Sequence, residues 1–442
     1  MDDLYQQLKL EILNRARVVF LWVYLVVRSL LRGLRHEDTS SDLQRRLAHF
    51  PPDLENFFKQ MMDDIEPVYH FQTAQILQMC LAAGEALPLH TFSFLEEEAQ
   101  NEQYALLAIT KPWKQKKLDK NNAVTEKRVH ARCRDLVKIS PEERPGKHPI
   151  FLVNFLRGTV REFLLTKDMR ELLSRWASPL FNPHLSLCRA SVAWMKVLPW
   201  PAEDSRSCIE ECPFYARQLE DRNTHTGVDT ALIEEMDKLA YYHWADPMMG
   251  MPKASGAWEK GWIFTLACQA GLSVYVNQKL RQSPDDIISK FGGPALYCIL
   301  LRPWGALTGA FQDLDIEKLR ILLKHGANPE AIYKGTTVGK HFLRSCAEKS
   351  ARANRKTRAS WAEAIRLLLE HRANPNVVTK ESYGDARSNL FLEVHGSRQT
   401  KAVAFIRQCC PDQAPMLEDV LENQKKSRMP SSWSPYSWIG WK

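Results

Sequence analysis

Two short patterns in the sequence have the spacing of chemical sites. Cys208 and Cys212 stand four residues apart, as metal-binding cysteines can, and the segment Gly335–Lys340 resembles a phosphate-binding loop. A zinc site needs four ligands held tetrahedrally, and no second Cys or His pair stands near these two at the usual spacing. A phosphate loop needs Gly-x4-Gly-Lys-Ser/Thr, but this one is a residue short and has His341 where a hydroxyl should hold magnesium. We therefore expect no metal, no cofactor and no ATP binding.

The sequence also lacks the common catalytic motifs. It contains no Gly-x-Ser-x-Gly, no His-Glu-x-x-His and no calcium-loop pattern. No nucleophile, base and orienting group are placed together by the sequence either. These absences favour a binding or scaffolding protein over an enzyme.

The composition excludes several classes of protein. The chain has 442 residues, 45% hydrophobic and 25% charged, as in folded soluble domains, and its length suggests about three domains. Lys and Arg outnumber Asp and Glu by 60 to 52, but the basic residues are scattered, so no nucleic-acid partner is expected. The ten cysteines lack the dense, even spacing of a secreted disulfide scaffold, and we expect reduced thiols in a cytoplasmic protein.

Apolar residues recur at helical spacing through the first part of the chain. The clearest stripe runs from Leu54 to Ile65 in three- and four-residue steps and predicts a helix packed into a core. Ser41 and Gln44 have the spacing of a capping box at a helix start. The apolar run Val18–Val27 is ten residues long, and a membrane span needs about 20. We therefore expect a buried helix here and no membrane.

The middle of the chain predicts a mixed segment. Glu126–Ile139 has a helical pattern, Pro149–Leu156 is a short apolar run of β character, and Thr159–Thr166 again predicts a helix. This order would suit a small winged-helix-like module. The basic run Lys114–Lys117 predicts a solvated loop, because no aromatic residues interleave with it as in a platform for nucleic-acid bases.

Two segments of the C-terminal half repeat each other. Asp315–Pro329 and Trp361–Pro375 each combine an amphipathic helical pattern with the same ending, His-x-Ala-Asn-Pro. The residues that recur are Leu319, Leu322, Leu323 and His325 in the first copy and Ile365, Leu368, Leu369 and His371 in the second. An apolar helix face of this kind must be covered by a neighbour, which predicts stacked repeats. Arg372 replaces Gly326 at a helix end that favours a left-handed backbone, at a cost of about 1 kcal/mol.

The repeated segments resemble the second helix and exit turn of ankyrin repeats. Trp262–Gly271 is similar to a first ankyrin helix, and Gly293–Tyr297 and Thr336–Thr337 would open the next two copies. The two repeat histidines are 46 residues apart, which exceeds the period of about 33 by roughly 13 residues. The excess falls at Pro303–Ala310 and Lys349–Ser360, so the repeats are degenerate.

Other segments resemble fungal NACHT-type signalling NTPases. Val19–Val23 and Leu43–Leu47 are similar to the end of the nucleotide-binding region, and Arg128–Cys133 and Phe155–Leu164 to the uncharacterised domain that follows it. Such relatives carry a histidine where Arg157 stands, so no role is carried over to that position. The phosphate loop of these NTPases is missing from this sequence. We therefore expect either a start downstream of the ATPase or a natural fragment.

The last residues are rich in tryptophan. Trp433, Trp438 and Trp441 place three of the chain's 13 tryptophans in its final ten residues. Indole rings left in water forgo a large burial gain, which is why disordered tails are poor in them. We expect this tail to dock, either on the chain's own helices or on a partner protein.

Together these features predict a mainly α protein: a helical bundle and a small winged-helix-like α/β module followed by an ankyrin-like α-solenoid. The expected regions are 1–83, a helical segment resembling the end of a NACHT module; 84–252, a NACHT-associated domain with the winged-helix-like part within 126–166; 253–385, degenerate ankyrin-like repeats; and 386–442, a C-terminal region with the Trp-rich tail.

The resemblance implies a non-catalytic sensor, scaffold or regulatory module that binds proteins in the cytoplasm. One alternative is nucleic-acid binding through the winged-helix-like module, which a basic patch on one helix would favour. Another is an enzyme whose site is assembled from distant residues. The partner and the oligomeric state stay open.

Overall fold

The chain is mainly α-helical and divides into two units. The computed structural model describes residues 2–15, 20–50, 54–143, 150–198, 205–220, 230–244, 262–301, 314–333, 335–349, 353–374, 407 and 410–428. Unit 1 comprises residues 1–104 and 113–190, and unit 2 comprises 105–112 and 191–442. The domain boundaries predicted from the sequence stay predictions.

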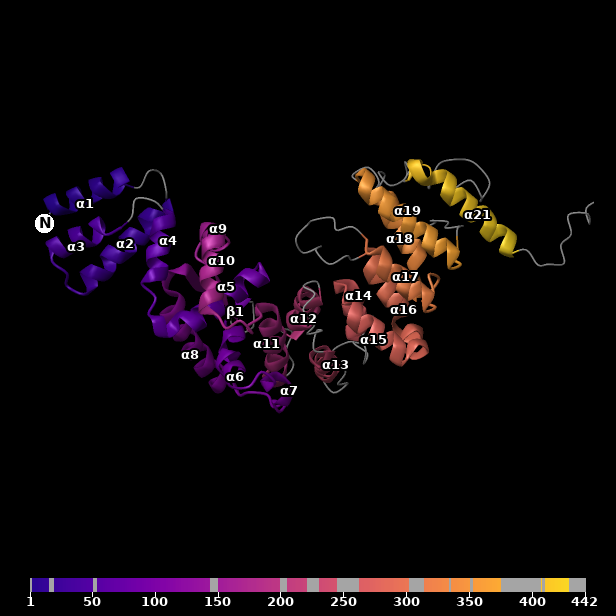
Figure 1. The fold of residues 1–442 in the computed structure, drawn as a ribbon, viewed down its shortest axis with the longest axis horizontal. Coiled ribbons are helices and arrows are strands. Elements are labelled where there is room, and N and C mark those ends of the chain that lie inside the picture. Colours follow the sequence, from indigo (N-terminus) through magenta and orange to yellow (C-terminus); the bar gives the residue numbers. More distant parts are fainter. Residues whose placement is uncertain are drawn as a thin grey trace, which may run out of the picture. The chain divides into compact units, whose positions relative to one another are not determined.

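Unit 1 begins with three helices around a small core (Figure 1). They are α1 (Asp2–Arg15), α2 (Phe20–Arg35) and α3 (Ser40–Ala48). The buried residues of this core are Trp22, Val26 and Leu30 from α2 and Leu43 and Leu47 from α3. Four-residue spacing places each set on one side of its helix, so burying these sets holds the two helices together. The apolar run at the start of α2 thus supplies part of a buried face, as the sequence predicts.

The cap at the start of α3 lies two residues before the predicted one. Thr39 Oγ1 accepts a hydrogen bond from the Asp42 amide at 3.3 Å, and the Asp42 carboxylate accepts from the Thr39 amide at 3.0 Å. The predicted Ser41–Gln44 box is wrong, because α3 starts at Ser40 and Ser41 is already inside its first turn. Hydrogen bonds from Thr39 hold the pKa of Asp42 below its ordinary value.

The rest of unit 1 packs helices around a small antiparallel sheet. Its elements are α4 (Leu54–Asp63), η1 (Pro67–Tyr69), α5 (His70–Ala83), β1 (Leu87–Pro88), η2 (Leu89–Phe94), α6 (Leu95–Gln100), α8 (Gln115–Cys133), η3 (Arg134–Leu136), β2 (Val137–Glu142), β3 (Ile150–Phe155), α9 (Gly158–Leu164) and α10 (Lys167–Trp176). Two further helices, α7 (Tyr104–Leu107) and α11 (Pro183–Val197), contribute residues to both units. The sheet order is β1-β3-β2, with Leu87 beside Val153 and Val137 beside Phe155. The strand and helix predicted at β3 and α9 are confirmed.

Helix α8 begins 11 residues before the helix predicted from the sequence and ends at Cys133. Its buried side includes Leu118 and Val129, but asparagines stand at 121 and 122, where the apolar stripe would continue, and this hides the helical pattern. The prediction of a loop at Lys114–Lys117 is therefore wrong, because Gln115 to Lys117 form the first turn of α8. The residues from Val137 on form β2 and not the end of a helix.

Unit 2 is built mainly from helix pairs. Its elements are α12 (Ser205–Glu220), α13 (Thr230–Trp244), α14 (Trp262–Ala270), α15 (Ser273–Gln282), α16 (Pro284–Leu301), α17 (Ile316–Lys324), β4 (Ile332–Tyr333), β5 (Thr336–Thr337), α18 (Val338–Lys349), α19 (Arg355–Glu370), η8 (Pro411–Gln413) and α21 (Ala414–Arg428). Helices α14, α16 and α18 pack in a row, α17 packs against α19, and α21 covers α19 (Figure 1). We call α14 to α19 the helix array.

The start of α16 differs from the sequence prediction. The sequence predicts that Gly293–Tyr297 opens a repeat, but this segment lies inside α16, which begins at Pro284 and continues through Pro294. Gly293 marks a close approach inside this helix, because a Cβ added there would meet the Ala331 Cβ at 2.9 Å. The glycine therefore lets the chain that leaves α17 approach α16 closely.

Three further segments of the predicted repeats are placed as follows. Thr336–Thr337 forms β5 directly before α18, and Thr337 Oγ1 accepts a hydrogen bond from the Lys340 amide at 3.3 Å. Within the predicted insertion Lys349–Ser360, α19 already begins at Arg355, so much of the excess lengthens this helix. The segment Pro303–Ala310 lies outside the described residues.

The turn between α14 and α15 is held by side chains of α12. Gly271 has φ +90°, and the Arg217 guanidinium donates to the carbonyl of Ala270 at 3.0 Å. One turn further along α12, the Glu220 carboxylate accepts from the Val274 amide at 3.2 Å. These contacts satisfy backbone groups that the end of one helix and the start of the next leave unpaired. Burial raises the pKa of Glu220, although the amide hydrogen bonds oppose this effect.

Gly271→Ala should destabilise unit 2 by about 1–2 kcal/mol more than Gly326→Ala. Both glycines have a left-handed backbone, but nothing lies within 4 Å of a Cβ added at Gly326. At Gly271 the Cβ would meet the Lys318 ammonium and, at 2.7 Å, the Arg217 guanidinium, which would have to release the Ala270 carbonyl. Urea unfolding of the full chain measures the difference. If the two variants lose the same free energy of unfolding, the contact between Arg217 of α12 and the Ala270 carbonyl does not contribute to stability.

Candidate functional site

The predicted repeat residues form the interior of the helix array. The six apolar ones are at most 4% exposed: Leu319, Leu322 and Leu323 in α17, and Ile365, Leu368 and Leu369 in α19. The two helices pack against each other, so the structure brings these six side chains together. His325 is exposed and His371 is partly buried, each directly after its helix. The six apolar residues are core, and a partner of the folded chain can reach the histidines but not these six.

The two repeat helices end in the same geometry. The Gly326 amide donates to the Leu323 carbonyl and the Arg372 amide to the Leu369 carbonyl, both at 3.0 Å. The amide that follows each one reaches a carbonyl one residue further back, at 3.0 and 2.9 Å. The φ angles are +91° at Gly326 and +70° at Arg372. The left-handed backbone predicted for Arg372 is therefore confirmed, and both ends have the pattern of a Schellman motif.

Both helices also begin at a side-chain cap. Asp315 Oδ1 accepts a hydrogen bond from the Lys318 amide at 3.1 Å, and Asn354 Oδ1 accepts from the Thr357 amide at 2.8 Å. A short polar side chain at this position satisfies one of the amides that a helix start leaves unpaired. The two left-handed ends are equivalent, but the caps stand at different positions of the repeated segments: Trp361 stands where Asp315 does, and Asn354 lies seven residues before Trp361. The two helices therefore share their buried stripe and their end, and α19 has about two additional turns at its start.

Polar contacts link the two copies at the surface of the array. Arg320 Nη2 donates to Glu363 Oε1 at 3.1 Å, and the Asn374 amide donates to Glu330 Oε1 at 2.8 Å. The Arg366 side chain also binds Glu363, and this hydrogen bond is the main reason why the pKa of that carboxyl is lowered. Exposed pairs of this kind each contribute about 1 kcal/mol or less, so they adjust the stacking that the apolar core produces.

The β4–β5 hairpin carries the exposed apolar surface of this region. Gly335 makes the turn with φ +86°, and the Ile332 side chain is 79% exposed. Behind it, the Tyr333 and Tyr297 rings lie 4.9 Å apart, and a His341 ring nitrogen is 3.0 Å from the Tyr333 carbonyl oxygen. The segment that resembles a phosphate loop is therefore this hairpin turn and the first turn of α18.

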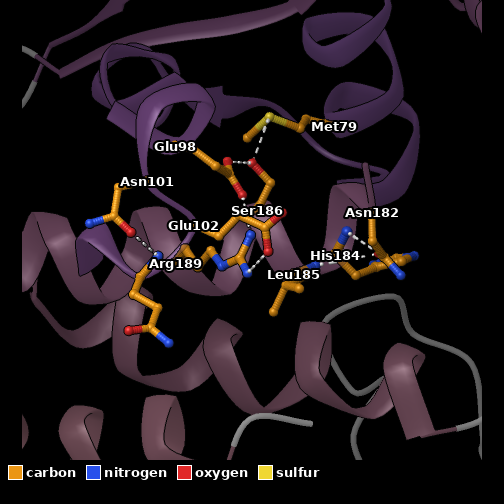
Figure 2. A network of polar contacts seen from close by, with 10 residues as sticks. Met79, Glu98, Asn101, Glu102, Asn182, His184, Leu185, Ser186 and Arg189 are labelled. Atoms are coloured by element: carbon orange, nitrogen blue, oxygen red, sulfur yellow. Dashed lines mark hydrogen bonds and ion pairs between the residues drawn. The ribbon is translucent and has the colours of Figure 1, made fainter. Parts of the chain in front are cut away.

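Unit 1 contains a buried charged network that joins α6 to α11 (Figure 2). The Glu98 carboxylate, 8% exposed, accepts a hydrogen bond from the Ser186 hydroxyl and, at 2.8 Å, another from Arg189 Nη1. Arg189 Nη2 also lies 3.4 Å from Glu102 Oε2. Burial raises the pKa of the neighbouring Tyr104 well above its ordinary value, and the charge of Glu98 adds to this effect.

This network has the residue types of an active site but not the accessibility of one. Ser186 is 1% exposed, and both oxygens of Glu98 already have partners. A nucleophile or base has to reach a substrate, which these positions prevent. We assign the network a structural role. The sequence analysis missed it, and the only signal was the spacing of Ser186 and Arg189, one turn apart on a helix.

Unit 2 contains a second buried charge, the ammonium group of Lys196. The side chain is 2% exposed and donates to the carbonyls of Leu106 and Ala108 at 2.9 Å each. It also pairs with Glu235 at 2.9 Å, so all three of its hydrogens have acceptors. Burial raises the pKa of Glu235, but hydrogen bonds from Lys196 and Lys238 outweigh this and lower it overall. The lysine holds the end of α7 and the residue that follows it against α11 and α13 and has no free lone pair for catalysis.

The described part of the chain shows no metal centre. No three or more His, Cys, Asp or Glu residues come together there as a metal would require. The free cysteines of the described residues are all buried: Cys80, Cys133, Cys188, Cys208, Cys212, Cys268, Cys298, Cys346 and Cys410. Burial raises the pKa of Cys80 to about 12, which keeps the thiol protonated and unreactive at neutral pH.

Three further candidates for a functional site are a cavity in unit 1, a membrane-spanning helix and the Trp-rich tail. A cavity of about 50 Å³ lies between α5, η2, α6 and α8, enough for a few water molecules. None of the helices in the described ranges combines the length and the apolar character that crossing a bilayer requires. The predicted docking residues Trp433, Trp438 and Trp441 lie outside the described residues.

One family model matches the chain. Residues 64–205 match a family described as Domain of unknown function (DUF7791). The matched range contains the three-stranded sheet, α8 and the Glu98 network. No curated protein and no solved structure has a significant match to the chain.

Arg372→Gly should give a folded chain that is about 1 kcal/mol more stable than Arg372→Ala. Both variants remove the arginine side chain, but only glycine adopts φ +70° without strain. Urea unfolding monitored by circular dichroism gives the difference. If the two variants are equally stable, the left-handed end of the second copy is not formed in solution.

Proposed function

We propose that this chain is a non-catalytic, regulatory protein-interaction module of a fungal NACHT-type signalling protein. In this proposal unit 1 includes a winged-helix-like module, and the helix array of unit 2 is a degenerate ankyrin-like solenoid. The observation that carries the proposal is the shared geometry of α17 and α19, which have the same buried stripe and the same left-handed end. Repeats of this kind bury their own apolar stripes and leave an extended face for partners.

The arrangement of the helix array supports the ankyrin-like part of the proposal. The pairs α14–α15, α16–α17 and α18–α19 follow one another, and the first helices of the pairs pack in one row. The β4–β5 hairpin stands directly before the third pair, where ankyrin repeats have their β-turn. Helix α21 covers the last helix, as a terminal cap must.

The order of elements around the sheet supports the winged-helix-like part. Helix α5, β1, α6 and α8 are followed by the antiparallel pair β2 and β3, with β3 in the middle of the sheet. The resemblance to the NACHT-associated domain rests on Arg128–Cys133 and Phe155–Leu164, which form the end of α8 and the passage from β3 into α9. Both segments lie within the matched range 64–205.

Ile332→Asp should abolish binding of a protein partner to the helix array without changing the stability of the chain. The side chain is 79% exposed, so a charge there costs the fold little but would be buried in an interface. The matched control is Leu180→Asp in unit 1, where the leucine is 83% exposed. Quantitative capture by the tagged full chain, with thermal melts of each variant, measures the effect.

A partner that is held by the wild type and by Leu180→Asp but lost with Ile332→Asp supports the proposal. If the wild type, Leu180→Asp and Ile332→Asp all capture the same partners and have the same melting temperature, the proposal is overturned.

The exposed side of α8 favours nucleic-acid binding as a second candidate function. Lys116, Lys120 and Lys127 are four and seven residues apart and lie on one exposed side of the helix. None of the three makes an ion pair within the described ranges, and the small residue Ala123 lies between them. An α-helix fits the major groove of a duplex, where lysines bind phosphates without reading the bases.

This second function predicts a steep salt dependence for binding of the full chain to a labelled duplex of about 20 base pairs. Three phosphate contacts correspond to a loss of affinity of about 40-fold between 50 and 200 mM salt. Lys120→Glu should weaken binding at least about fivefold, whereas Lys324→Glu, an exposed lysine of α17, should not. Fluorescence anisotropy measures all three, and no binding at low salt removes this candidate.

A further inference from the structure

The cavity between α5, η2, α6 and α8 has charged groups in its lining. Glu96 of α6 pairs with Arg128 Nη2 at 2.9 Å, and its other oxygen lies 3.6 Å from Arg132 Nη2. The two arginines stand one turn apart on α8, and all three charged side chains line the cavity. Since one carboxylate offsets one of the two guanidinium charges, the charged lining has a net charge of +1.

The guanidinium group of Arg132 is short of hydrogen-bond acceptors. Its side chain is 16% exposed, and the distance of 3.6 Å to Glu96 is too long for a hydrogen bond. Its Nε atom is buried and has no partner among the described groups. A guanidinium group carries five N–H donors in one plane, and a buried donor without an acceptor costs free energy. A carboxylate fits such an edge, because its two oxygens accept from Nε–H and Nη–H in parallel.

Two further residues of the lining carry polar atoms without a partner. Thr125 stands two turns before Arg132 on α8 and is 2% exposed, and its hydroxyl group has no hydrogen bond. Gln72 of α5 has no partner for Oε1. The threonine hydroxyl can donate to an anion, and the Gln72 amide can rotate to present its NH₂ group. Buried polar groups are nearly always hydrogen-bonded in proteins, so three such residues around one cavity indicate a polar occupant.

The size and the rest of the lining limit what this occupant can be. The cavity has a volume of about 50 Å³, which corresponds to about four non-hydrogen atoms. Buried apolar side chains complete much of the lining, among them Ile76, Phe92 and Val129. Acetate has this size, a single negative charge and an apolar methyl group. Phosphate has no apolar part, and the net positive charge of the lining disfavours a cation.

We propose that this cavity binds a small free monocarboxylate, with Arg132 and Thr125 as donors to the carboxylate and the apolar lining against its methyl group. A ligand of about four non-hydrogen atoms gains little binding free energy, so the Kd for acetate is on the order of 1 mM. The inference rests on unit 1 alone and is independent of the proposed partner binding by the helix array. Either one can therefore fail without the other.

Saturation-transfer NMR of the full chain with acetate measures the binding. Acetamide, which has the shape of acetate without its charge, should bind at least about tenfold more weakly. Thr125→Val removes the hydroxyl group at nearly constant volume and should raise the Kd for acetate at least about fivefold. The matched control is Thr265→Val in unit 2, because Thr265 is also buried with an unpartnered hydroxyl but does not line the cavity. This control should bind acetate like the wild type.

Glu96→Gln tests the same site in the opposite direction. The substitution removes the carboxylate that competes for the two arginines and raises the net charge of the lining from +1 to +2. Acetate should therefore bind at least about threefold more tightly. The Glu96 side chain is 46% exposed, so thermal melts should show a folded chain. Glu55→Gln, which removes the exposed partner of Lys59 away from the cavity, should leave the Kd unchanged.

Four results would overturn the proposal. The first is no saturation transfer to acetate at about 20 mM, and the second is a folded Thr125→Val chain that binds acetate like the wild type. The third is acetamide binding as tight as that of acetate, which would show that the cavity holds water and other neutral molecules only. The fourth is displacement of acetate by an equal concentration of inorganic phosphate. If Thr125→Val does not fold, Glu96→Gln decides, and a Kd equal to that of the wild type overturns the proposal.

Discussion

The helix array depends on the ability of the backbone to reverse direction within one or two residues after a helix. Three helices of unit 2 end in a left-handed residue, Gly271, Gly326 and Arg372. Only this conformation lets the next amides fold back onto the last carbonyls and sends the chain across the end of the helix. If the turn opened, the following segment would leave the apolar stripe of its own helix uncovered. The cost of a left-handed arginine is accepted at one of these ends because the buried stripe beside it contributes more.

Buried charges hold the parts of the chain that do not repeat. Glu98 with Arg189 joins α6 to α11, and Lys196 with Glu235 joins α11 to α13. In each case the charged group has hydrogen-bond partners for its remaining positions, which removes most of the penalty for burying it. Buried pairs of this kind add little net stability but strongly disfavour any other packing, because a shift would leave a charge unpaired. The apolar stripes stabilise the helices, and the charged pairs determine which helices meet.

The surfaces available for binding differ between the two units. In unit 2 the six apolar repeat residues are interior, and the most exposed apolar side chains are Ile109, at 83%, and Ile332 in the β4–β5 hairpin, at 79%. In unit 1 the lysine side of α8 is exposed and charged, whereas Tyr24, Val27, Leu31 and Leu34 of α2 are exposed and apolar. Because these surfaces differ in chemistry, a substitution in one of them tests one partner class and leaves the others unaffected.

The sequence by itself determined the local structure of the array: the Leu-rich stripes, the equal spacing of the two copies and the left-handed end at Arg372. These features follow from residues within a few positions of one another, where helix geometry relates spacing directly to a face. Only the tertiary structure decided the pairing of Ser186 with Glu98, 88 residues apart, and the role of Gly293, which is set by Ala331. Helix α2 shows the same limit: Val26 is buried and Val27 is 38% exposed, although both belong to one apolar run of the sequence. Long-range contacts decide between these outcomes, and their identity is not contained in local spacing.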